Sequence, residues 1–289
     1  MNSNPTGRKG LYIASPGHAA FAAIMIGLGV LGLIKGDFTV VWQGVPNGVP
    51  AREVLAYLCS LVSLACGVGL LFRQSAALAA RVLLGYFALW FVLWRIYGLF
   101  VLPVVGSTWS CGQTMVMTSA AWVLFVWFAT DWDRKHLVFA TGEFGLLMAR
   151  LLYAMGLVPF GMAHFVYPKE TMVLVPGWLP WHMFWAYFTG ATFIVASVAV
   201  LIGLFARLAV TLSALQMGLF ALLVWLPRIA AGTPLSAFQW GEVVMTLALT
   251  AAAWVVADSY RRTPWFAVGT HSAERIIERI IVDSGPAEA

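Results

Sequence analysis

Charged side chains are scarce in this chain: they make up 10% of its 289 residues, whereas soluble domains carry roughly 25%. Hydrophobic residues make up 61%. A soluble fold of this composition could not cover its surface with polar groups, so the sequence predicts a protein whose solvent is lipid. Strict apolar–polar alternation is also lacking, which argues against a transmembrane barrel and favours an all-α, polytopic membrane helical bundle.

Clustered metal ligands and nucleotide-binding motifs are lacking too. The cysteines Cys59, Cys66 and Cys111 show no CxxC spacing, and we interpret them as packed apolar residues, with a Cys59–Cys66 redox pair as the alternative. The histidines stand in separate segments without H-x-x-x-H or E-x-x-H spacing, so no metal site is predicted. Lysine and arginine form no basic stripe, and no nucleic-acid partner is expected.

What the chain does contain is a series of apolar runs of about twenty residues, which predict eight transmembrane helices and the lipid bilayer as a partner. The runs cover approximately residues 18–36, 53–72, 76–100, 108–129, 145–167, 182–204, 207–229 and 236–258. If both termini lie on one side, that side receives most of the Lys and Arg near span ends, including Arg8, Arg134 and Arg262. The positive-inside rule then predicts cytoplasmic termini in the cell inner (plasma) membrane.

The two halves of the chain resemble each other. Gly27 and Gly32 align with Gly156 and Gly161, which places Lys35 opposite His164; further on, Ala56-Tyr57 aligns with Ala186-Tyr187, and Gly112-Gln113 with Gly241-Glu242. Matches that recur in one order at a nearly constant offset are typical of an internal duplication. Because each half holds an even number of spans, the two four-helix repeats are predicted to be parallel.

We therefore divide the chain into five parts. They are a cytoplasmic N-terminal segment (1–17), a first four-helix repeat (18–130), a polar linker (131–144), a second four-helix repeat (145–260) and a cytoplasmic tail (261–289). In the tail, isoleucines at 276, 277, 280 and 281 share one face of a short amphipathic helix. We expect that face to dock on the protein's own loops or on a partner, with adsorption to the membrane as the alternative.

The second half resembles the DoxX-like family of small four-helix membrane proteins. The resemblance rests on His164-Phe165, Pro168, Val175-Pro176, Trp178-Leu179-Pro180 and the stretch LIGLFARLA at 201–209. It covers residues 145–258, and residues 18–131 through the internal repeat. The family is named for a subunit of a quinone-reducing thiosulfate oxidoreductase. The resemblance thus implies an accessory or quinone-associated subunit of a membrane redox assembly, with quinone as the cofactor and an oxidoreductase subunit as the partner.

The alternative function is a lipophilic-substrate enzyme or carrier that uses a cavity near the outer face. Its candidate catalytic residues are His164, Arg228 and Glu242, because ionisable groups in a span usually face the bundle interior and have a partner. We predict that Glu242 pairs with Arg228, either as a clasp between two helices or as part of a site. His164 could shuttle protons or hydrogen-bond a quinone carbonyl; otherwise it is an interfacial histidine bonded to the proline-rich loop.

Four further residues are candidates for cofactor binding. Trp178 and Trp181 flank Pro180 in the outer loop, where they are either interfacial anchors or an aromatic lid over a lipophilic ligand. Lys35 and Arg95 stand at outer span ends of the first half.

Overall fold

The computed structural model describes residues 10–38, 45, 48–101 and 104–269, and for 94–101, 104–110 and 237–238 it describes the backbone only. The regular elements in these residues are helices, joined by turns and loops, and there is one isolated bridge between Leu11 and Phe72. Eight helical segments of the described chain are long and apolar enough to cross a bilayer. The predicted polytopic helical bundle is therefore confirmed, whereas the predicted tail helix at 272–283 lies outside the described residues.

The spans follow the predicted segments within a few residues. In chain order they are α1 (Pro16–Lys35), α2 (Arg52–Leu70), α3 (Ala76–Val101), α4 (Val104–Phe128), α6 (Gly142–Val166), α8 (His182–Leu201), a composite seventh span and α11 (Ala237–Ser259). The seventh span joins α9 (Ala206–Phe220), the π-helical turn η2 (Ala221–Trp225) and α10 (Leu226–Ala230). Short helices occupy the connections: α5 (Asp131–His136), η1 (Val138–Ala140) and α7 (Pro168–Met172).

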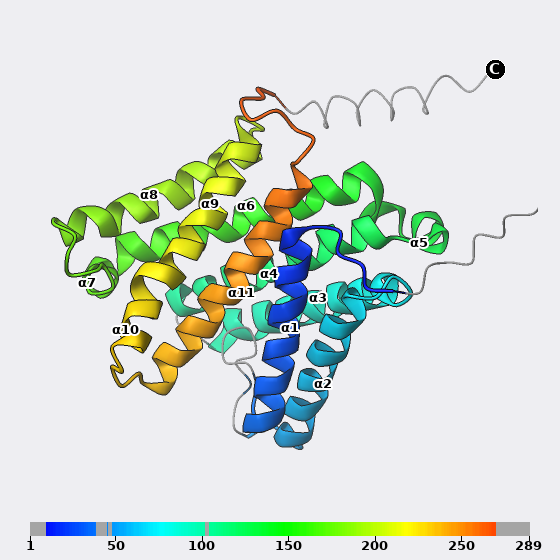
Figure 1. Cartoon of the computed structure of the whole chain (residues 1–289), viewed down its shortest axis with the longest axis horizontal. Coiled ribbons are helices and arrows are strands. Elements are labelled where there is room, and N and C mark those ends of the chain that lie inside the picture. The colour runs from blue at the N-terminus through cyan, green and yellow to red at the C-terminus, as the bar shows by residue number, and fades with distance from the viewer. Residues whose placement is uncertain (1–9, 39–44, 46–47, 102–103, 270–289) are drawn as a thin grey trace, which may run out of the picture.

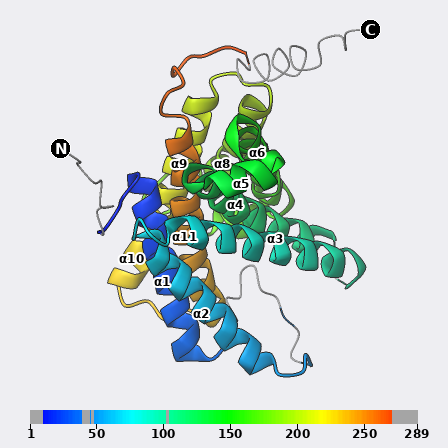
Figure 2. The same cartoon turned by 90° about the vertical axis from the view of Figure 1, so that its right-hand side faces the viewer.

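Each span packs on its neighbours in the chain, and α11 returns to pack on α1. Because α4 and α11 also pack on each other, the spans form two rings that share these two helices. The first ring contains α1, α2, α3, α4 and α11, and the second contains α4, α6, α8, α9 and α11. In both views α4 and α11 lie at the centre (Figure 1 and Figure 2), and Figure 1 shows α5 and α7 at opposite ends of the molecule.

The two halves bury equivalent positions. The buried residues of α2 are Ala56, Ser60, Ser63, Cys66, Gly67 and Leu70, and those of α8 lie 130 positions later, at Ala186, Gly190, Phe193, Ala196, Ser197 and Val200. The same offset relates Ala76, Ala79, Ala80, Leu83 and Phe87 of α3 to Ala206, Ala209, Val210, Ser213 and Met217 of α9. The second and third spans of each half therefore present the same helix face to the interior.

The first spans match in a register that differs from the predicted one. Seven buried residues of α1, namely Gly17, Phe21, Ala22, Met25, Leu28, Gly29 and Gly32, correspond to α6 residues 132 positions later, namely Ala149, Tyr153, Ala154, Leu157, Phe160, Gly161 and His164. His164 is therefore equivalent to Gly32, and the predicted equivalence with Lys35 is wrong by three positions. The alignment followed the glycine spacing, whereas packing on the second span determines which residues face inward.

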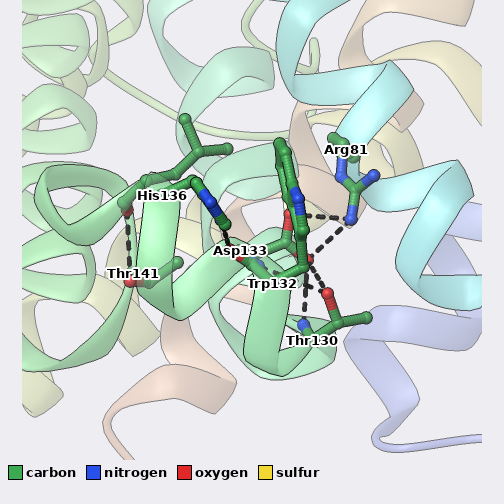
Figure 3. A network of polar contacts seen from close by, with 7 residues as sticks. Arg81, Thr130, Trp132, Asp133, His136 and Thr141 are labelled. Carbon is green, nitrogen blue, oxygen red and sulfur yellow. Dashed lines mark hydrogen bonds and ion pairs between the residues drawn. The ribbon is translucent and has the colours of Figure 1, made fainter.

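The end of the bundle that carries α5 contains an ion pair whose carboxylate is buried and whose guanidinium is partly exposed. Asp133 has a fully buried side chain, and its carboxylate lies 2.7 Å from the Arg81 guanidinium of α3. It also accepts hydrogen bonds from the Thr130 amide and hydroxyl at 2.8 and 2.7 Å. Figure 3 shows Trp132 between Arg81 and His136, with the guanidinium carbon 5.2 Å from the indole centroid. The predicted polar linker is thus anchored to the first half.

These contacts determine how Asp133 titrates. Burial by itself would raise the pKa of this carboxyl, but the hydrogen bonds from Arg81 and Thr130 outweigh burial, so the pKa lies below its ordinary value. Asp133 is therefore an ionised, well-partnered group at this end of the bundle.

Candidate functional site

A cavity of about 110 Å³ lies inside the second ring, near the end of the spans that carries α7. All five spans of the ring and the α7 connection contribute side chains to it. The lining residues are Gln113, Phe160, His164, Thr171, Leu174, Phe193, Met217, Phe220, Trp225, Glu242, Met245, Thr246 and Leu249. Most of these side chains are apolar, so the few polar groups among them stand in a poorly solvated environment.

His164 is the most deeply placed titratable side chain of this cavity. It is 7% exposed, and its imidazole lies near the rings of Phe193 and Phe220, with centroids 6.1 and 6.4 Å away. Nδ1 lies 2.9 Å from the Phe160 carbonyl oxygen, to which it must donate its hydrogen. Nε2 is buried and has no hydrogen-bond partner among the residues that the structure describes. In the neutral ring, which apolar walls favour, Nε2 therefore offers a lone pair to the cavity.

Gly190 of α8 leaves space for the His164 side chain where α6 and α8 approach closely. A β-carbon placed on Gly190 would lie 2.6 Å from the His164 Cβ and 3.0 Å from the Gly161 carbonyl oxygen. Such distances are too short for any residue larger than glycine unless α6 and α8 move apart. At the equivalent contact of the first half, Gly32 faces Ser60, so the larger side chain is on the opposite helix.

Glu242 faces the same cavity from the first turns of α11. The helix start is held by a capping box in which Ser236 and Gln239 bond each other's backbone amides. The Glu242 side chain is half-buried, and within the described chain its carboxylate makes no hydrogen bond or ion pair. Gln113, its predicted repeat equivalent, lines the cavity from α4. Two of the three predicted catalytic candidates, His164 and Glu242, are therefore brought together.

The predicted ion pair between Glu242 and Arg228 is wrong. Arg228 instead donates to the Val173 carbonyl oxygen at 3.1 Å, and its guanidinium carbon lies 5.6 Å from the Trp225 ring centroid. None of the ion pairs in the described residues joins it to Glu242. A π-helical turn separates α9 from α10, and Arg228 of α10 contacts the segment after α7 and is not among the residues that line the cavity.

Several residues that line the cavity were not predicted from the sequence. Trp225 lines the cavity from the π-helical turn, and its Nε1 donates to Thr246 Oγ1 at 3.2 Å. Thr246 stands four residues after Glu242 and so shares its helix face; that spacing could have identified it. Phe160, Phe193 and Phe220 carried no such signal, because an aromatic residue in an apolar span looks the same whether it faces lipid or a cavity.

The other predicted ligand contacts lie elsewhere. Trp178 and Trp181 are 70% and 79% exposed, and neither lines the cavity, so they do not cover it as a lid. Their positions fit interfacial anchors. Lys35 is exposed at the end of α1, and the side chain of Arg95 lies outside the described residues. Within the described chain, no group of three or more His, Cys, Asp and Glu side chains is placed to hold a metal ion.

Comparison of the chain with models of protein families, with curated proteins and with solved structures finds no match. The DoxX-like resemblance therefore stays a prediction. The fold and the cavity define this chain as a multi-pass integral membrane protein with a small, mostly apolar cavity inside the bundle.

Proposed function

We propose that this membrane protein binds a small lipophilic molecule, as a carrier or as a binding subunit, in the cavity of the second ring. The observation that carries the proposal is the unpartnered Nε2 of His164, which shares this cavity with the unpaired carboxylate of Glu242. Buried polar atoms are nearly always hydrogen-bonded, and ionisable groups inside spans usually serve a ligand or an ion path. A ligand with a polar head would satisfy both groups.

The volume limits the size of that ligand. A cavity of roughly 150 Å³ lined by apolar side chains is enough to bind benzene. The present cavity, at about 110 Å³, suits a head group of one ring or less, and any longer tail would lie outside it. The outer-face carrier predicted from the sequence is compatible with this geometry.

The proposed quinone-associated subunit meets one chemical difficulty. A quinone carbonyl only accepts hydrogen bonds. The neutral His164 ring has its single N–H on Nδ1, and this N–H already donates to the Phe160 carbonyl, so the ring has no hydrogen to donate to a quinone. The reduced quinol carries hydroxyl donors and would fit Nε2 better. A role beside a membrane oxidoreductase stays a prediction, and at this site it would involve the reduced form.

Ligand-dependent stabilisation tests the proposal. Purified full-length protein is unfolded by heat in detergent with benzylamine, benzyl alcohol or benzaldehyde, three one-ring probes with different head groups. We expect at least one probe to raise the unfolding midpoint, because a ligand that binds only the folded state stabilises it. Leu174→Trp, which fills the cavity, should remove the effect. Leu222→Trp, at a half-exposed position of the π-helical turn, is the control and should respond like the wild type. If the wild type responds to no probe, or both variants respond alike, the proposal fails.

The proposed orientation places α5 in the cytoplasm and α7 outside. Cysteines introduced at Lys35 and at Arg134, both exposed, should react with a membrane-impermeant thiol reagent from opposite sides of the inner membrane. Labelling of both positions from one side would contradict the eight-span topology.

A further inference from the structure

The polar atoms that line the cavity are mainly hydrogen-bond acceptors. The Thr246 hydroxyl donates its hydrogen to the Glu242 carbonyl at 2.7 Å, and the Thr171 hydroxyl donates to backbone carbonyls of its own turn at 3.1 Å. The Trp225 N–H donates to the Thr246 hydroxyl oxygen. With His164 Nε2 and the Glu242 carboxylate, these lining groups have lone pairs that can still accept hydrogen bonds, while the Gln113 amide carries both donor and acceptor atoms. A ligand that donates hydrogen bonds is therefore favoured over one that only accepts them.

The carboxylate of Glu242 also favours a ligand that donates hydrogen bonds. A carboxylate in a membrane span is costly unless it meets a cation or stays neutral. Within the described chain the cation closest in sequence, Arg228, is bonded to Val173 instead. No ion pair in the described residues supplies a counter-charge to Glu242, so a cationic ligand could supply it.

Aromatic rings provide the remaining walls. Phe160 and Phe193 pack edge to face with centroids 5.9 Å apart, and Phe220 and Trp225 stand on the seventh span. Aromatic faces attract organic cations, most strongly where water is excluded. A metal ion would instead require several oxygen ligands, which aromatic rings do not supply.

We propose that the ligand is a small lipophilic ammonium ion, whose charge pairs with Glu242 and whose N–H donates to His164 Nε2 among the aromatic walls. This inference rests on the proposed function, since it names the ligand class of the same cavity. It distinguishes a cationic amine from a neutral alcohol or quinol and from a carbonyl compound, which have the same ring but lack the charge.

The three one-ring probes separate these classes. Dissociation constants of benzylamine, benzyl alcohol and benzaldehyde are measured by calorimetric titration of the full-length protein in detergent near neutral pH. We expect benzylamine to bind at least about tenfold more tightly than either neutral probe, because a hydrogen bond to a charged group is worth more than one between neutral groups. This ranking is obtained with the wild type and needs no variant.

Glu242→Gln removes the charge and keeps the shape. It should weaken benzylamine binding at least about tenfold and leave benzyl alcohol within about twofold. Glu170→Gln, which changes an exposed carboxylate outside the cavity, is the control and should alter neither. If benzyl alcohol or benzaldehyde binds most tightly, or benzylamine is insensitive to Glu242→Gln, the ammonium proposal is overturned while the proposed binding function stands. If no probe binds, both fail.

Discussion

The two halves of this protein bury the same helix faces, yet they differ at one contact between their first and second spans. In the first half Gly32 faces the hydroxyl of Ser60; in the second half His164 faces Gly190. The glycine is on the first span in the first half and on the second span in the second half, where the His164 imidazole occupies the space beside it. One shared packing arrangement can therefore hold either a closed helix contact or a polar group directed into a cavity, depending on which helix carries the glycine.

The largest effect is expected when the second half is given the serine of the first. Gly190→Ser would place a β-carbon 2.6 Å from the His164 Cβ, and overpacking of this kind costs about 1 to 3 kcal/mol. We expect a marked loss of folded protein by size-exclusion chromatography. Adding His164→Gly should restore much of it, since the pair then matches the first half. Gly27→Ser is the control, because no atom of the described residues lies within 4 Å of a β-carbon there. Equal yields for Gly190→Ser and Gly27→Ser would contradict the comparison.

The converse change in the first half should have a smaller effect. A β-carbon on Gly32 would lie 2.1 Å from Ser60 Oγ, but a hydroxyl can rotate away more easily than a backbone can move. Gly32→Ala should lower the thermal midpoint, and Gly32→Ala with Ser60→Gly should recover part of the loss. If Ser60→Gly adds its own destabilisation and rescues nothing, the contact between Gly32 and Ser60 does not limit packing as we infer.

Two buried histidines provide the next test. His18 Nδ1 accepts from the Ala14 amide and Nε2 donates to the Leu70 carbonyl, both at 3.1 Å, so each ring nitrogen is satisfied. His164 satisfies one nitrogen only. His18→Phe should thus destabilise the protein more than His164→Phe, by about 1 kcal/mol, because it leaves two backbone groups without a partner. A larger loss for His164→Phe in chemical unfolding would show that Nε2 has a structural partner after all.

The smallest expected effect is the dependence of stability on pH. Arg81 pairs with Asp133, whereas the equivalent residue of the second half is Thr211, which forms no ion pair in the described chain and donates to the Arg207 carbonyl. Since the folded-state pKa of Asp133 is lowered, its contribution to stability is present above the unfolded value of about 3.9 and is lost as pH falls through the folded value. Between pH 7 and 5 we expect no change from this group, and a decline below about pH 4. Asp133→Asn should lack that part of the decline; parallel acid-unfolding curves would contradict it.

Much of the fold could be predicted from the sequence. Eight apolar runs were found within a few residues of their observed ends, because a span must exclude charge over a length set by the bilayer. The alignment of Ala56 with Ala186 agrees with the packing of α2 and α8. The alignment of Lys35 with His164 was wrong, because glycine spacing also recurs on faces that do not pack.

Less of the site could be predicted. His164 and Glu242 were candidates because ionisable residues are rare in spans, and that rarity is visible in the chain itself. A cavity shared by His164, Glu242 and Arg228 was predicted, but Arg228 does not line it. Arg228 was also assigned the wrong partner, because the π-helical turn at 221–225 has no clear sequence signal and changes where every later side chain points.

By itself the sequence determined that this protein lies in a membrane, how many times its described helices can cross it, and which few residues are polar within the spans. Those properties follow from hydrophobicity summed along the chain, which does not depend on neighbours in space. The tertiary structure alone decided that His164 keeps one nitrogen free, that Glu242 shares its cavity and that Arg228 does not. Such outcomes depend on the rotation and closeness of packed helices, where a shift of one residue moves a side chain about 100° around the helix.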